Sequence, residues 1–190
     1  MTLHHLVFNP YEVNTFIVAA ADGQCAIVDP SCCSPAEQAT LKKFIADKEL
    51  RPTWLINTHG HFDHVIGNAF VCKTWPVKTA AHRGDLFLME NAYRQGEIFG
   101  FSVEQPPTPE VFLNDGDTVA FDNVTLQVYH IPGHSPGSIV LSLPGYKLNP
   151  ICVTLIKFLQ LPGRRTAAAI KINKQPIKRL LFRNDIASFL

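Results

Sequence analysis

Three histidines and an aspartate fall within six consecutive positions of the stretch LINTHGHFDHVIG (55–67). The four residues are His59, His61, Asp63 and His64. They follow the apolar run PTWLIN (52–57), which has the length of a strand, so the cluster is predicted on a loop at the carboxyl end of that strand. Imidazole nitrogen and carboxylate oxygen both bind zinc and similar divalent metals. The cluster therefore predicts a metal-binding loop.

A second loop places His134 between prolines and glycines in HIPGHSPGSIVLSL (130–143). Proline fixes its own φ, and Gly133 and Gly137 can take positive φ, so the sequence predicts a sharp loop ahead of a further strand. Such a loop would hold His134 in a fixed position. We expect this histidine to be a fourth metal-binding histidine beside the first cluster.

The remaining pattern predicts alternating strands and helices in one globular domain. The length of 190 residues, 46% of them hydrophobic, suits a single core. One helix is predicted from the N-cap Ser34, with Pro35 at its first position and Glu37 completing a capping box. A second helix is predicted over 83–100, with Leu86, Met89, Tyr93 and Phe99 on its inner side. Strands are predicted at 3–8, 14–20, 25–29, 52–57 and 76–82, and as a hairpin pair over 114–131.

Composition excludes several classes of protein. The five cysteines form no C-x-x-C pair, so neither a disulfide framework nor a cysteine-only zinc site is expected. Apolar runs fall short of the roughly 20 residues that span a bilayer, and the opening MTLHHLVFNPYE is unlike a secretory signal, so we predict a cytoplasmic protein. The acidic balance of residues 1–146, with 8 Lys and Arg against 15 Asp and Glu, offers no surface for nucleic acid.

The motifs H-x-H-x-D-H and HIPGHSPGS, together with IVDPS (27–31), resemble the metallo-β-lactamase superfamily, and most closely its glyoxalase II-type hydrolases. The resemblance covers residues 1–145. It implies an α/β fold of the αββα sandwich type, in which two mixed sheets lie face to face with helices outside. It also implies zinc-dependent hydrolysis of a small thioester, ester or related acyl substrate by a metal-bound water.

The resemblance also implies roles for individual residues. His59, His61 and His134 would hold the first metal, Asp63 and His64 would begin a second metal site, and Asp63 would orient the catalytic water. Asp29 would shape the loop as a hydrogen-bond acceptor and would not be a ligand. Two alternatives stay open: a persulfide dioxygenase, which uses one iron held by two histidines and an aspartate, and a non-catalytic metal-binding protein.

The resemblance stops at about residue 146. Residues 147–190 carry 9 Lys and Arg, one acid (Asp185) and no histidine. The family would supply a bridging aspartate and a later histidine here, and Cys152 stands near the expected aspartate without its glycine. We interpret 146–190 as a basic tail that is out of frame or otherwise replaced; the alternative is a tail that contacts anionic lipid or nucleic acid. The first interpretation predicts an incomplete C-terminal half, one tightly bound zinc, weak activity, self-association, and no nucleic-acid or membrane partner.

Overall fold

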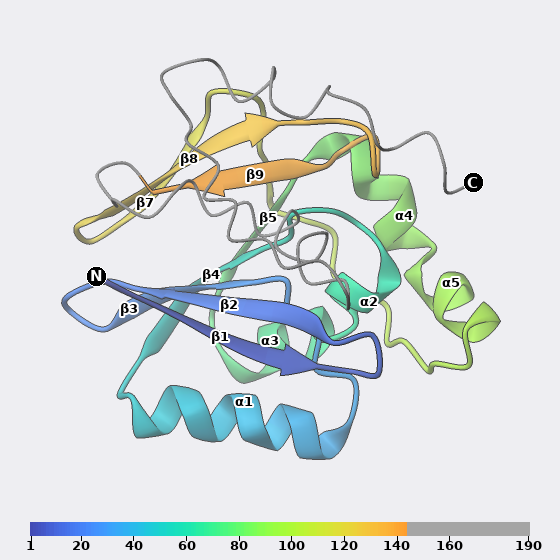
Figure 1. Ribbon diagram of the computed structural model, residues 1–190, viewed down its shortest axis with the longest axis horizontal. Helices are drawn as coiled ribbons and strands as arrows, with labels where there is room; N and C mark the ends of the chain where they lie inside the picture. Colours follow the sequence, from blue (N-terminus) through green and yellow to red (C-terminus); the bar gives the residue numbers. More distant parts are fainter. Residues whose placement is uncertain (144–190) are drawn as a thin grey trace, which may run out of the picture.

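The computed structural model describes residues 1–143, which form two β-sheets packed face to face (Figure 1). The first sheet has the strand order β1-β2-β3-β4-β5-β6 and the second has the order β7-β8-β9. The strands are β1 (Thr2–Phe8), β2 (Val13–Ala19), β3 (Gln24–Val28), β4 (Arg51–Ile56), β5 (Lys78–Ala81), β6 (Val111–Phe112), β7 (Thr118–Phe121), β8 (Val124–His130) and β9 (Ile139–Ser142). The helices are α1 (Pro35–Asp47), α2 (Phe62–Val65), α3 (Asn68–Thr74), α4 (Leu86–Glu90), α5 (Ala92–Ile98) and the short 3₁₀ helix η1 (Arg83–Asp85).

The first sheet is mixed, and its parallel part positions the polar loops. β1, β2 and β3 pair antiparallel, whereas β3, β4, β5 and β6 pair parallel. The carboxyl ends of parallel strands meet at one edge of a sheet, where α/β proteins place their ligands. The loops that follow β3, β4 and β5 begin at this edge, and they carry Asp29, the histidine cluster and Asp85.

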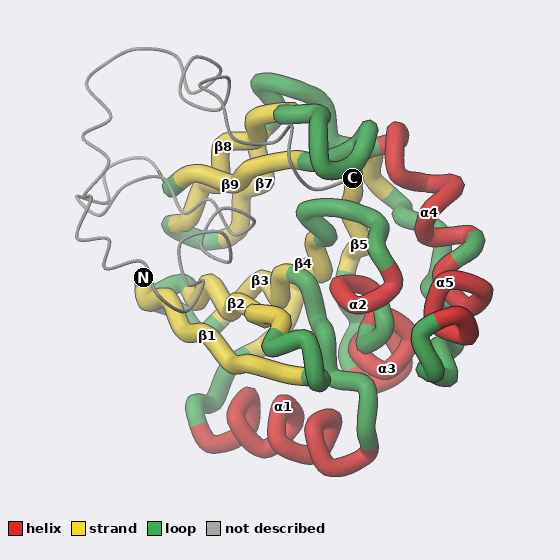
Figure 2. The backbone as a smooth tube through the Cα atoms, turned by 45° about the vertical axis from the view of Figure 1, so that its right-hand side comes forward, coloured by secondary structure: helices red, strands yellow, loops and turns green. Residues whose placement is uncertain are grey.

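The first sheet is covered on both faces, as its central strands require. All seven residues of β2 are buried. One face packs against Leu41 and Ile45 of α1 and Val71 of α3, and the helices lie beneath this sheet in Figure 2. The other face packs against the second sheet through a shared apolar core. The first sheet therefore has one layer of apolar core on each of its two faces.

Helix α1 begins where the sequence predicts it. The Ser34 side chain accepts a hydrogen bond from the backbone N–H of Glu37, and the Glu37 side chain accepts one from the backbone of Ser34. This reciprocal pair is the predicted capping box, with Pro35 at the first helical position. The same carboxylate also accepts the backbone N–H of Asn9 at 2.7 Å, which ties the β1–β2 turn to the helix.

The single helix predicted over 83–100 is wrong. The segment is divided into η1, α4 and α5, with a break at Asn91, where φ is −106° and ψ is 14°. The Asn91 side chain donates to the carbonyl of Phe87 at 2.8 Å and so competes with the backbone pattern of a continuous helix. Because the second half turns away, Tyr93 and Phe99 are exposed, and of the residues expected on the inner side only Met89 is fully buried.

The described residues supply three layers of the expected sandwich, one of helices and two of sheets. On the outer face of the second sheet, Thr118, Ala120 and Thr125 are exposed. The basic tail predicted at 146–190, including Cys152, lies outside the described residues. Within residues 1–143, none of the helices is long and apolar enough to cross a membrane.

Candidate metal centre

The first two histidines of the cluster lie just beyond β4. Asn57 and Thr58 continue the strand into the interior, His59 is 2% exposed, and His61 is the N-cap of α2. The apolar run of β4 is buried in both core layers, so it fixes the start of this loop. The two imidazole rings lie 4.8 Å apart at their centroids and nearly perpendicular, with an interplanar angle of 89°.

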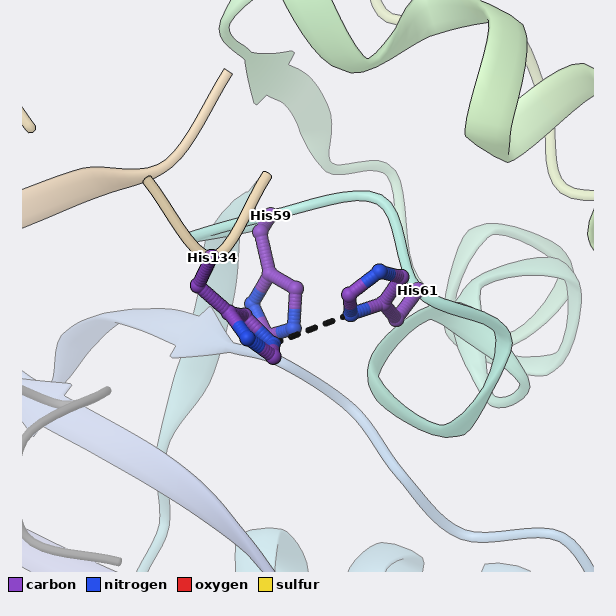
Figure 3. Close-up of side chains that lie close together, drawn as sticks. All are labelled: His59, His61 and His134. Atoms are coloured by element: carbon purple, nitrogen blue, oxygen red, sulfur yellow. Dashed lines mark hydrogen bonds between the residues drawn. The ribbon is translucent and has the colours of Figure 1, made fainter. Parts of the chain in front are cut away.

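The second loop brings His134 to the same point. Nε2 of His134 lies 3.0 Å from Nδ1 of His61, although the two residues are 73 positions apart (Figure 3). The ring of His134 is 4.8 Å from that of His59. The loop is anchored beside the first one, because the backbone N–H of Ile139 donates to the carbonyl of Thr58 at 2.8 Å. The two predicted histidine loops therefore converge.

The three histidines suit a divalent metal. Each offers one ring nitrogen, and these three atoms all lie within 4.8 Å of one another. A zinc ion bound by nitrogens at about 2.0–2.1 Å separates neighbouring ligand nitrogens by about 3.3 Å, so only small side-chain movements are needed. Three imidazoles with space for water are a donor set typical of catalytic zinc. The site can therefore hold a metal through His59, His61 and His134.

The electrostatic setting keeps these imidazoles available as ligands. Burial lowers the pKa of His61 below its usual 6.5, while the charges of Asp63 and Asp85 act in the opposite direction. Burial also lowers the pKa of His134, and the neighbouring His61 and His64 add to this effect. Both rings are thus neutral near pH 7, and a neutral ring nitrogen has the lone pair that a metal needs.

Asp29 accepts hydrogen bonds from the histidine loop, which is the loop-shaping role that the resemblance implies. It is fully buried, and one carboxylate oxygen accepts the backbone N–H of Thr58 at 2.7 Å. The other oxygen accepts the Thr58 hydroxyl at 2.5 Å and lies 3.1 Å from Nδ1 of His64. Asp29, His59 and His64 also form a compact group of possible ligands. Asp29 and His64 lie within hydrogen-bond distance of each other, so Asp29 orients the imidazole of His64.

Asp63 lies beside the histidines but outside both groups of possible ligands. Its carboxylate is 3.8 Å from Nε2 of His64, and its side chain is 18% exposed. Among the described residues, Asp63 and His64 are not joined by a third ligand to make a second centre. The described residues therefore do not test the second metal site that the resemblance implies, and Cys152 lies outside them.

Asp85 is a site residue that the sequence patterns did not single out. It is 1% exposed and hydrogen-bonded to both histidine loops. The signal was present in its position, because Asp85 follows closely after β5, the parallel neighbour of β4. Polar residues at neighbouring carboxyl ends meet at one edge. That rule would have placed Asp85 near His59.

A family model described as the metallo-beta-lactamase superfamily matches residues 8–148. The match covers more than half of the chain, and the chain therefore belongs to the metallo-beta-lactamase superfamily. The fold inferred from the sequence is confirmed by this match and by the two packed sheets.

Curated relatives include hydrolases. The chain is 33% identical over 136 residues to hydroxyacylglutathione hydrolase of Anaeromyxobacter dehalogenans, covering 72% of this chain and 44% of that protein. It is 27% identical over 141 residues to the probable metallo-hydrolase YqgX of Bacillus subtilis, covering 73% of this chain and 64% of that protein. The matches thus span less than two thirds of both relatives. They confirm the resemblance to glyoxalase II-type hydrolases.

A solved structure entitled TTHA1623 in a di-iron-bound form is similar over most of its length. The TM-score is 0.63 at 26% sequence identity, and the similarity covers 84% of this chain and 87% of that chain. By its title, that protein binds two iron ions.

Proposed function

We propose that this protein is a zinc-dependent hydrolase of thioesters or related acyl compounds. The observation that carries the proposal is the convergence of His59, His61 and His134, whose ligand atoms lie within 4.8 Å of one another. The similarity to a hydroxyacylglutathione hydrolase supports a thioester of glutathione as the substrate class. A small molecule is the substrate proposed. A cytoplasmic setting fits the free thiols at Cys25, Cys32, Cys33 and Cys72, which persist in a reducing compartment.

In this proposal the three histidines hold the metal and the two aspartates act around them. A bound zinc ion would supply hydroxide near neutral pH and polarise the carbonyl that is attacked. Asp63 is partly exposed beside the histidines, and its carboxylate would accept a hydrogen bond from the water and orient it. Asp29 keeps His64 and the Thr58 backbone in place. Iron is the alternative metal, in line with the di-iron title of a similar structure.

We expect one tightly held metal and slow turnover. Asp63 and His64 would provide only two ligands for a second ion, fewer than a stable site takes. Loss of one electrostatic partner of the transition state typically lowers a rate by ~10²- to 10³-fold. The activity proposed for this chain is therefore weak compared with that of a complete two-metal enzyme.

The test is metal analysis after dialysis, combined with hydrolysis of an S-acyl glutathione. We expect about one zinc per chain and slow thioester cleavage that a chelator abolishes. His134→Ala should lose both metal and turnover. Asp63→Ala should keep the tightly bound metal and lose turnover, because the carboxylate acts on water. His5→Ala is the matched control, since His5 is an exposed histidine on β1, and it should keep both.

Three results would contradict the proposal in different ways. Bound iron with oxygen uptake on a persulfide would identify the dioxygenase. Metal binding without turnover of any acyl substrate would identify a binding protein. Turnover at tens per second, which is common for enzymes, would show that the tail completes a two-metal site.

A further inference from the structure

One carboxylate joins the two histidine loops. Oδ2 of Asp85 accepts the backbone N–H of Gly60 at 2.8 Å and the hydroxyl of Ser135 at 2.6 Å, while Oδ1 accepts the backbone N–H of Gly137 at 2.6 Å. Gly60 lies between His59 and His61, and Ser135 follows His134 directly. His59, His61 and His134 are thus each adjacent in sequence to a residue that donates to Asp85.

The burial of this carboxylate makes its bonds consequential. Asp85 is 1% exposed, and three hydrogen-bond donors contact its carboxylate. None of the ion pairs among the described residues includes it. A buried charge is tolerated only when it is well hydrogen-bonded, and bonds to a charged acceptor are stronger than neutral ones. Removing a donor therefore leaves the buried charge of Asp85 with too few hydrogen bonds. The bonds to this carboxylate thus stabilise the contact between the two loops.

Two glycines are present because Asp85 comes so close. A Cβ added at Gly60 would lie 2.8 Å from the carbonyl oxygen of Asp85, and one added at Gly137 would lie 2.7 Å from its Cγ. Gly137 does not have the positive φ that the sequence predicted, and neither does Gly60. Each glycine is therefore needed for close approach and not for backbone conformation. Gly60 of H-G-H and Gly137 of S-P-G-S thus both leave room for the same residue, Asp85.

The fold delivers Asp85 to this position through η1. The turn begins at His82, whose Nδ1 accepts the backbone N–H of Gly84 at 3.0 Å, and the backbone N–H of Asp85 donates to the carbonyl of His82 at 3.1 Å. The guanidinium of Arg83 lies 3.9 Å from the ring centroid of Phe112, which fixes the turn against β6. Asp85 is thus held rigidly next to the end of β4.

We propose that Asp85 is a positioning residue that sets the spacing of the two histidine loops and, through it, the affinity and geometry of the metal centre. The inference rests on the metal binding in the proposed function and is independent of the substrate. Asp29 orders one loop internally, whereas Asp85 couples His59 and His61 to His134. Outer-shell partners of this kind typically change metal affinity by 10–100-fold when they are altered.

The experiment compares metal binding by Asp85→Asn, Ser135→Ala and the unaltered chain. An amide has one acceptor oxygen, so Asp85→Asn places an NH₂ group against a backbone N–H. We expect zinc dissociation constants raised about 10–100-fold, measured by competition with a chromophoric chelator. The d–d absorption of bound Co²⁺ should also change, because the ligand geometry relaxes. Ser135→Ala removes one of the three donors and should show a smaller change in the same direction.

Asp47→Asn, on the exposed side of α1, is the matched control and should keep the affinity and the Co²⁺ spectrum of the unaltered chain. Equal affinity and equal spectra for Asp85→Asn would overturn the inference alone. If Asp85→Asn does not fold, an unchanged affinity and spectrum in Ser135→Ala would overturn it. An unaltered chain that binds Co²⁺ but cleaves no thioester would reject the proposed activity and leave this inference to be decided by the variants. An unaltered chain that binds no metal would reject both.

Discussion

Asp29 combines an unusual backbone with a demanding side chain. Its φ is 51°, in the left-handed region, and the residue is fully buried. Asp and Asn are among the few residues that adopt this conformation readily, since their side chains are short and polar. The left-handed turn directly after β3 aims the carboxylate at Thr58 and His64. An aspartate suits position 29 because its side chain is short, negatively charged and able to accept these hydrogen bonds.

Asp29→Asn should weaken metal binding while the fold is kept. Asparagine tolerates the left-handed conformation, but its amide cannot accept hydrogen bonds on both sides. If the zinc dissociation constant rises 10–100-fold, the amount by which saturating zinc raises the free energy of unfolding falls by about 1.4–2.7 kcal/mol. The measurement is thermal or denaturant unfolding with and without zinc. Asp122→Asn is a matched control, because Asp122 is exposed and also has a positive φ of 43°. An equal response to zinc in both variants would contradict the role given to Asp29.

At the residue scale, the cluster could be recognised from the sequence as a possible metal-binding loop, and Asp85 could not. His59, His61, Asp63 and His64 stand together in the sequence, and a motif of contiguous residues needs no knowledge of the fold. The partners of Asp85 lie 25 and 50 or more positions away. Its meaning depends on which strands are neighbours, and that is a property of the sheet.

Among the elements, α1 depends on one carboxylate at its N-terminus. Glu37 accepts hydrogen bonds from the backbone N–H groups of Asn9, Cys33 and Ser34 and from the Cys33 thiol. Burial acts to raise the pKa of Glu37, but these four donors outweigh it and hold the pKa below 4.5. The charged form is therefore the one that joins the helix to the β1–β2 turn.

Glu37→Gln should destabilise the protein near neutral pH. Hydrogen bonds to a charged group contribute about 1.5–3 kcal/mol, so we expect a loss of this order in the free energy of unfolding. Because the pKa of Glu37 is lowered by folding, its stabilisation is present above pH 4.5 and is lost as the pH falls through the folded value. The difference between the two proteins should shrink below pH 4.5 in urea unfolding. A difference that is independent of pH would show that packing, not charge, is responsible.

The start of α1 could be predicted from the sequence, whereas the division of residues 83–100 into three helices could not. The start of α1 was predictable because Ser34, Pro35 and Glu37 each have a local mechanism. The segment 83–100 has helical spacing too, but the Asn91 side chain competes with the backbone, and the chain turns. Apolar spacing alone does not show whether neighbouring turns of a helix face the same core.

For the molecule as a whole, we predict self-association. Within residues 1–143, β9 pairs only with β8, so its other edge has no strand partner in this part of the chain. A strand edge of this kind favours contact with another chain. Light scattering during size exclusion should give a mass that rises with concentration. A monodisperse monomer with one cooperative melting transition would contradict this prediction.

The long separation between His61 and His134 has a consequence for how the chain folds. Before the second sheet docks, the chain has His59 and His61 on one loop, and the third imidazole lies 73 residues further along. Closing so long a loop costs entropy before the contacts return it. All three histidines can therefore hold one ion only after the two sheets have docked, and an ion bound by all three would slow the separation of the sheets.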